Sequence, residues 1–208
     1  MIRVEDAAGE AGRLRMIRLD RPDKANALTG AMLAQVAEAA EGAWAAGAQV
    51  LVLTGTGKVF SAGADLEAAK AGLATDPVWE RASAAIAAFP GLSIAALNGT
   101  LAGGAFGMAL ACDLRIAAEG ASFFYPVMRL GYLPQPSDPG RLAALVGPAR
   151  AKMILMGGTR IAAAEALAWG LVDRLAPAPD VLDAARALAA DALAADPAHV
   201  KAIRAQLG

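Results

Sequence analysis

A run of 31 residues without a charged side chain, from Ala82 to Cys112, restricts the folds that are open to this chain. The run is longer than a membrane-spanning helix needs. It is interrupted by Pro90-Gly91, Asn98-Gly99 and Gly103-Gly104, and such breaks would leave main-chain groups without hydrogen-bond partners in lipid. It therefore predicts a buried core made of a helix end, a strand, a turn and a second helix, rather than a transmembrane segment.

Strands and helices alternate along the rest of the chain. Residues 13–19 alternate polar and apolar side chains, as a half-buried strand does. Thr29 is the predicted cap of a helix that runs to about Ala46. We predict further strands at 49–54, 93–97, 113–118 and 172–175, an irregular loop at 121–140, and helices at 77–88, 104–111, 141–146, 149–156, 162–169 and, divided near Asp196-Pro197, over 180–207. This alternation predicts an α/β fold with parallel strands.

Composition excludes several classes of protein. The chain is 57% hydrophobic and 19% charged, which excludes a disordered protein, and its net charge of −1 gives no general attraction for nucleic acid or a membrane surface. Its only cysteine, Cys112, and only histidine, His199, exclude a metal site with two or more such ligands. We expect Cys112 to be buried and His199 to be exposed. The N-terminus has no apolar signal region, so we expect a cytoplasmic protein.

Three glycine-containing loops follow predicted strands. The loop at 55–60 departs from nucleotide-binding motifs, because Val59 replaces the P-loop Ser/Thr and Phe60 replaces the third dinucleotide-binding glycine. The loops at 61–66 and 98–104 are built of small residues and each opens a helix, where N–H groups point outward. Either loop alone is also explained by close packing or, at Asp65, by a helix cap. Together, after neighbouring parallel strands, they predict two N–H groups aimed at one point, which is an oxyanion hole.

Several segments resemble the enoyl-CoA hydratase/isomerase (crotonase) family, in order and over nearly the whole chain. The resemblance rests on residues 19–28, 51–66, 95–104 and 111–115, on Leu130-Gly131, Arg141-Leu142 and Val146-Gly147, and on 163–172. It implies a crotonase-like spiral of ββα units with C-terminal helices, here shortened. We expect the spiral core to span 1–175 and a short helical segment to span 176–208.

The resemblance also implies a site and a substrate. The substrate is an acyl-CoA thioester, so that coenzyme A enters as part of the substrate and no separate cofactor is expected. The oxyanion hole falls on the N–H groups of Ala64 and Gly104. The residues that the resemblance places against the substrate or CoA are Lys24, Ala25, Ala27, Ala62, Asp65, Leu66, Gly103 and Val127. A solvated loop lysine is an equally good interpretation of Lys24.

The sequence departs from the family where its hydratases carry two catalytic glutamates. The matching positions are Gly107 and Val127, and Gln135 stands where some relatives use an aspartate. General acid–base catalysis needs a titratable group within hydrogen-bond reach. Tyr132 and Asp138, in the loop that borders the acyl pocket, are candidate replacements, and Tyr125 and Arg129 are also near. Packing under the loop for Tyr132, and a helix cap for Asp138, are the competing interpretations.

Two function classes remain. The first is an enzyme that stabilises the enolate or oxyanion of a CoA thioester, in decarboxylation, isomerisation or thioester hydrolysis. The second is a non-catalytic acyl-CoA-binding member of the family. A serine hydrolase is disfavoured because no Gly-x-Ser-x-Gly motif is present. The sequence ends at Gly208, before the further helices usual in the family, so we expect a more open pocket or an altered assembly, still a homo-oligomer (trimer or hexamer).

The missing glutamates predict that typical hydration does not occur. Crotonyl-CoA incubated with the protein should lose its double bond no faster than in buffer, because no carboxylate at position 107 or 127 activates water. The absorbance of the enoyl thioester measures this directly. A clear hydration rate that Gly104→Pro abolishes would contradict the prediction.

Overall fold

The computed structural model describes residues 1–6 and 13–207, and its strands form two sheets. The larger sheet has the order β1-β2-β3-β5-β7-β10, and all of its neighbouring pairs are parallel except β1 with β2. Its strands are β1 (Ile2–Asp6), β2 (Leu14–Leu19), β3 (Val50–Gly55), β5 (Leu92–Leu97), β7 (Leu114–Ala118) and β10 (Arg174–Ala176). The α/β class and the crotonase-like architecture are confirmed, and β1 is an edge strand that the sequence did not reveal.

The second sheet consists of very short strands in the order β4-β6-β8-β9. They are β4 (Val59–Ser61), β6 (Thr100–Ala102), β8 (Ser122–Phe124) and β9 (Ile161–Ala162). Three strands of the large sheet each lead into one of these: β3 into β4, β5 into β6 and β7 into β8. The sequence analysis missed this sheet because two or three residues are too few to show a periodicity.

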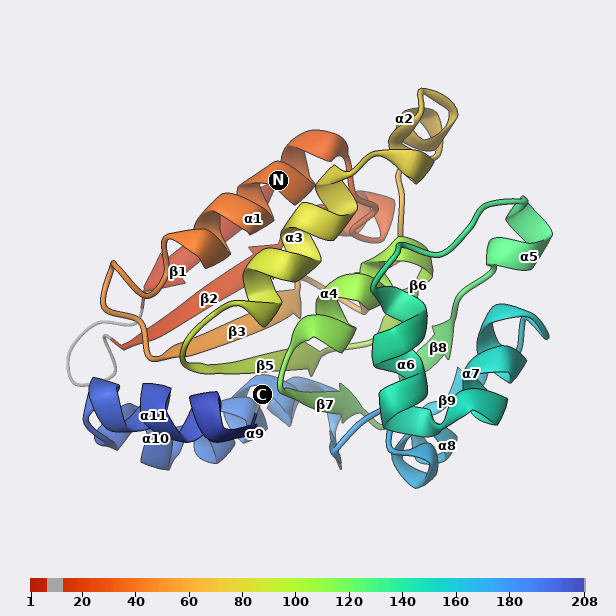
Figure 1. Cartoon of the computed structure of the whole chain (residues 1–208). Helices are drawn as coiled ribbons and strands as arrows, with labels where there is room; N and C mark the ends of the chain where they lie inside the picture. The colour runs from red at the N-terminus through yellow and green to blue at the C-terminus, as the bar shows by residue number, and fades with distance from the viewer. Residues whose placement is uncertain (7–12, 208) are drawn as a thin grey trace.

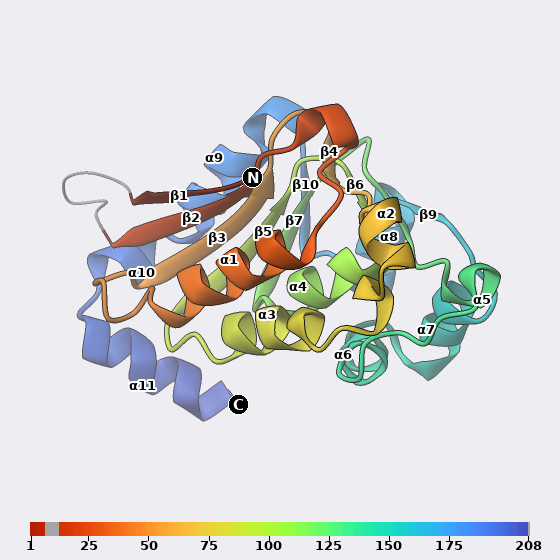
Figure 2. The same cartoon turned by 90° about the horizontal axis from the view of Figure 1, so that it is seen from above.

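Helices cover both faces of the large sheet (Figures 1 and 2). On one face lie α1 (Gly30–Glu41), α3 (Val78–Ala87) and α4 (Phe106–Ala111), and α9 (Val181–Leu188) contacts β5 and β7 from the other. The remaining helices are α2 (Leu66–Lys70), α5 (Val127–Leu130), α6 (Asp138–Val146), α7 (Pro148–Leu155), α8 (Ala163–Trp169), α10 (Ala190–Ala194) and α11 (Pro197–Leu207), with 3₁₀ turns η2 (Pro22–Lys24), η3 (Leu73–Thr75), η4 (Gly103–Ala105) and η5 (Ala178–Asp180).

Most predicted elements are present, with corrections at their ends. Thr29 caps α1, accepting from the Met32 N–H, but the helix ends at Glu41 rather than near Ala46. The predicted loop at 121–140 contains β8, α5 and the start of α6, and residues 180–207 hold three helices rather than two. The uncharged run forms part of the core, and no helix among the described residues has the length and apolar character to cross a membrane.

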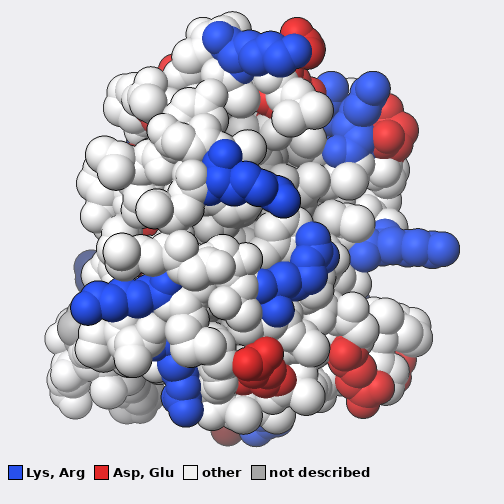
Figure 3. Space-filling view, turned by 90° about the vertical axis from the view of Figure 1, so that its right-hand side faces the viewer, with Lys and Arg blue, Asp and Glu red and all other residues white. Residues whose placement is uncertain are grey.

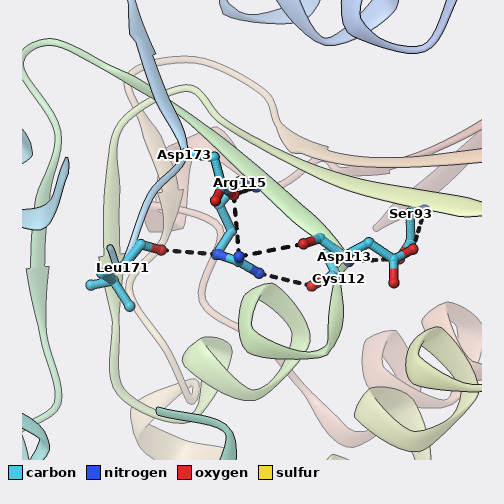
Figure 4. A network of polar contacts seen from close by, with 6 residues as sticks. All are labelled: Ser93, Cys112, Asp113, Arg115, Leu171 and Asp173. Carbon is cyan, nitrogen blue, oxygen red and sulfur yellow. Dashed lines mark hydrogen bonds and ion pairs between the residues drawn. The ribbon is translucent and has the colours of Figure 1, made fainter. Parts of the chain in front are cut away.

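A buried arginine joins the C-terminal part of the chain to the large sheet (Figure 4). Arg115 on β7 is only 3% exposed, and its guanidinium donates to the carbonyl oxygens of Leu171 (2.9 Å) and Cys112 (2.8 Å) and pairs with Asp173 (3.1 Å). Asp113 beside it accepts from the Ser93 N–H and hydroxyl, both at 2.8 Å. One network therefore connects β5, the end of α4, β7 and the segment that leads into β10.

Replacing Arg115 should destabilise the whole fold. Arg115→Met removes the donors for three carbonyl groups, those of Leu171, Cys112 and Asp113, and the partner of Asp173, so we expect a loss of about 3 kcal/mol in the free energy of unfolding. Urea unfolding followed by circular dichroism measures it. Arg186→Met, which breaks an exposed pair with Asp183, is the matched control and should leave stability nearly unchanged. Equal midpoints for the two variants would contradict the prediction.

Candidate functional site

Two loops leave the small sheet side by side and approach each other closely. β4 and β6 pair in parallel, with Ser61 opposite Leu101, and the loops that follow them begin at Ala62 and Gly103. Gly63 and Gly103 have positive φ angles of 92° and 56°. A Cβ at Gly63 would lie 2.9 Å from the Ala102 carbonyl oxygen and 3.4 Å from the Gly103 Cα. Only glycine fits this contact between backbones.

The N–H groups of Ala64 and Gly104 follow these two glycines. Within residues 1–6 and 13–207, neither has a main-chain or side-chain acceptor; Gly104 is the second residue of η4, where a helix start supplies none. The predicted loops are therefore adjacent, but they follow β4 and β6 of the small sheet rather than the long buried strands. Two unpaired donors on adjacent loops can bind one anionic oxygen when they point at the same position.

The segment before α1 holds the first loop in place. The Ser61 hydroxyl donates to the Asn26 carbonyl at 2.8 Å and accepts from the Gly63 N–H at 3.1 Å. The Leu28 N–H donates to the Gly63 carbonyl, and the Asp65 N–H donates to the Leu28 carbonyl, each at 2.8 Å. These bonds position the peptide units on both sides of Ala64.

Asp65 has a structural role in this arrangement. Its carboxylate caps α2 by accepting from the N–H groups of Glu67 and Ala68, and it pairs with Arg21 at 2.7 Å. The hydrogen bond from Arg21 lowers the pKa of Asp65 from its ordinary value. The helix-cap interpretation of Asp65 is thus confirmed.

A cavity of about 260 Å³ opens beside the two loops. It brings together seven of the predicted residues: Ala62, Ala64, Leu66, Gly103, Gly104, Val127 and Tyr132. Lys24, Ala25, Ala27 and Asp65 are not in its lining, and Lys24 is exposed on η2. Tyr132 is 41% exposed, so packing under the loop is not its environment. Figure 3 shows the face of the molecule that carries α2 and α5, over which Lys and Arg side chains are spread.

Further lining residues were not among the sequence candidates. Trp79 of α3 lies against the loop, because a Cβ at Gly104 would meet its ring at 3.2 Å, and its indole N–H donates to the Leu73 carbonyl. Tyr125, which the sequence placed near the candidate loop, also lines the cavity, and the other lining residues that the sequence did not single out as candidates are Ala69, Lys70, Ala74, Pro126, Leu130, Leu133 and Gln135. No spacing in the sequence connects Trp79 with Gly104, since the contact forms only when α3 packs beside α4.

Asp138 is not a helix cap but a buried carboxyl group. Ser137 is the cap residue of α6, and Asp138, 1% exposed, accepts at Oδ2 a hydrogen bond of 2.8 Å from the Tyr125 hydroxyl. Burial raises the pKa of Asp138 to about 7, while the Tyr125 hydrogen bond and the Arg141 guanidinium oppose this shift and Glu80 adds to it. Burial likewise raises the pKa of Tyr125 far above its ordinary value.

The single cysteine and the single histidine are not in the lining of this cavity. Cys112 is buried, as expected, and burial raises the pKa of its thiol to about 12. His199 is exposed on α11, also as expected. Among the described residues, no three His, Cys, Asp or Glu side chains gather in a way that could hold a metal ion.

A family model and a curated relative both place the chain among proteins that act on CoA thioesters or are named for them. Residues 10–208 match the family model described as enoyl-CoA hydratase/isomerase. Carnitinyl-CoA dehydratase from Salmonella paratyphi A is 39% identical over 166 residues, which cover 75% of this chain and 62% of that protein. The chain therefore matches less than two thirds of that relative's length.

Solved structures agree with this match. An enoyl-CoA hydratase from Bacillus anthracis superposes with a TM-score of 0.90 at 31% identity, covering 99% of this chain and 81% of the other. A putative enoyl-CoA hydratase/carnithine racemase from Magnetospirillum magneticum gives a TM-score of 0.88 at 31% identity, covering 98% and 81%.

The raised pKa of Asp138 makes stability depend on pH. Between about pH 4 and pH 7 the folded protein retains on Asp138 a proton that the unfolded chain has already lost, so stability falls as the pH rises to about 7 and changes little above it. Asp138→Asn keeps an acceptor for Tyr125 and removes the charge. Relative to this variant, the wild type should lose about 2–3 kcal/mol of unfolding free energy between pH 5 and pH 8.

Urea titrations at pH 5 and pH 8 measure this difference. Asp183→Asn, which removes an exposed carboxylate on α9, is the control and should follow the wild type at both pH values. If the unfolding free energies of the wild type and Asp138→Asn changed equally between pH 5 and pH 8, ionisation of Asp138 would not destabilise the fold, which would contradict the prediction.

Proposed function

The chain belongs to the enoyl-CoA hydratase/isomerase family, and on this premise we propose that it binds an acyl-CoA thioester and stabilises its enolate or oxyanion. The N–H groups of Ala64 and Gly104 are the proposed donors to the thioester oxygen. The observation that carries the proposal is that both lack an acceptor among the described residues and both border one cavity.

The walls of the cavity support an acyl thioester as the ligand. They are mostly small or apolar and include Ala62, Leu66, Val127, Leu130 and Leu133. Such a lining favours an alkyl chain. Lys70 borders the cavity, and with the exposed Lys24 it is a candidate partner for the phosphates of CoA.

The residues at positions 107 and 127 support a reaction that does not activate water. Gly107 and Val127 are both buried and offer no carboxylate. Isomerisation and decarboxylation both pass through an enolate that the two N–H groups can stabilise, and neither reaction adds water to the substrate. We therefore propose enolate chemistry of this kind rather than hydration.

A binding titration tests the proposal. Short, branched and malonyl-type acyl-CoA thioesters are compared with free CoA by calorimetry, and at least one thioester should bind more tightly than CoA. Equal affinity of all the thioesters and CoA, or no binding of any, would contradict the proposal.

Two variants at one position isolate the N–H donor. Gly104→Pro removes the N–H, whereas Gly104→Ala keeps it, and both place a Cβ against Trp79. We expect Gly104→Pro alone to lower the preference for thioester over CoA by about five- to tenfold, the value of one hydrogen bond. The same loss in both variants would assign the effect to crowding by Trp79 instead.

A further inference from the structure

The hydrogen-bonded pair of Tyr125 and Asp138 is the one group of buried titratable side chains beside the cavity that the proposed function leaves unused, within the part of the chain that the structure describes. Tyr125 lines the cavity together with Ala64 and Gly104. Its ring stacks on Phe106 of α4, with centroids 5.4 Å apart. Its hydroxyl also receives a long hydrogen bond, 3.4 Å, from the N–H of Gln135, another lining residue.

One oxygen of the Asp138 carboxyl group has no hydrogen-bond partner among the described residues. Oδ2 accepts from Tyr125, and the unpaired oxygen is Oδ1, which is buried. An unpaired buried carboxyl oxygen is costly and calls for an explanation. A catalytic role for the carboxyl group is one such explanation.

The position of Asp138 depends on a glycine in the helix that starts at the cavity. A Cβ at Gly107 would lie 2.7 Å from Asp138 Oδ1, too close for a real contact. Gly107 follows the cavity-lining Gly104 by three residues, so the two lie on one face of the helical segment. The Asp138 carboxyl group, supplied by α6, thus fills the space that a side chain at position 107 would enter.

From this geometry we propose that Tyr125 and Asp138 are the acid–base pair of the site, with Tyr125 as the catalytic residue and Asp138 as the residue that positions it and takes up its proton. This inference rests on the proposed function, because it needs a thioester bound at Ala64 and Gly104.

The proposed step is the enolisation of the bound thioester. The Tyr125 oxygen forms a bond to the α-proton while the Tyr125 proton passes to Asp138 Oδ2. The electron pair of the broken C–H bond becomes the C–C double bond of the enolate, and the carbonyl π pair moves to the oxygen that the two N–H groups face. The negative charge passes from Asp138 to the enolate, and return of a proton to either end of the enolate completes exchange or isomerisation.

The groups around Asp138 support this step near neutral pH. Arg141 on the same helix favours the carboxylate, Glu80 on α3 and burial favour the acid, and Gly107 on α4 contributes no charge. The pKa of about 7 that results suits a group that gains and loses a proton at physiological pH.

Exchange of the α-protons of butyryl-CoA for deuterium in D₂O, followed by NMR, is the experiment. The wild type should catalyse exchange, at a rate that rises through about pH 7 as Asp138 loses its proton. Tyr125→Phe and Asp138→Asn should each slow exchange by about 100-fold or more. Both should bind butyryl-CoA within about threefold of the wild type, since neither removes a donor to the thioester oxygen.

The possible failures are distinguishable. Exchange is measured on butyryl-CoA or, where another thioester of the titration binds more tightly, on that thioester, and failure of all of them to bind more tightly than CoA would overturn the proposed function. A thioester bound more tightly than CoA, but exchanged at the wild-type rate by Tyr125→Phe or not exchanged by the wild type, would overturn the acid–base pair alone. Circular dichroism spectra that match the wild type establish that each variant is folded.

A pair of exchanged side chains tests the location of the carboxyl group. Asp138→Gly should abolish exchange. Adding Gly107→Glu should restore at least about a tenth of the wild-type rate, because the Cβ of residue 107 lies beside the space that the Asp138 carboxyl group vacates. A folded double variant that binds butyryl-CoA without any recovery would overturn the equivalence of the two positions.

Discussion

The contact between Gly63 and Gly103 is the constraint on which the candidate site depends. Two backbones in a conformation that favours glycine meet without side chains between them, and a Cβ at Gly63 would be only 2.9 Å from the Ala102 carbonyl oxygen. This closeness brings two loops from different parts of the chain to one point. The residues that follow, Ala64 and Gly104, both line the same cavity.

The rest of the fold maintains that contact from both sides. The large sheet delivers β4 and β6 in parallel, and the segment around Asn26 and Ser61 fixes the first loop by hydrogen bonds. The network around Arg115 joins β7 to the C-terminal part of the chain, so the sheet under the second loop is held by residues far along the sequence. The positions of main-chain groups in such a site are set by these hydrogen bonds, because backbone groups have no side-chain rotamers that could adjust them.

The sequence predicted what depends on local pattern and on the family resemblance. Buried strands at 49–54 and 93–97, the Thr29 cap and the two small-residue loops were all readable from neighbouring residues. The small sheet was not, because β4 and β6 have three residues each and are defined by pairing across about 40 positions. Asp138 resembled a helix cap because it precedes Pro139, and only the packing of α6 beside α4 shows it bonded to Tyr125.

Asp138 also illustrates why the absence of a glutamate at position 107 does not by itself mean that the site lacks a carboxyl group. A Cβ at position 107 would lie 2.7 Å from Asp138 Oδ1, so a side chain there would displace the Asp138 carboxyl group from its present position. The glycine at 107 therefore leaves room for a carboxyl group from another helix. Residue-by-residue comparison along the chain finds an empty catalytic position, whereas comparison in space finds a buried carboxyl group there, hydrogen-bonded to a tyrosine that lines the cavity.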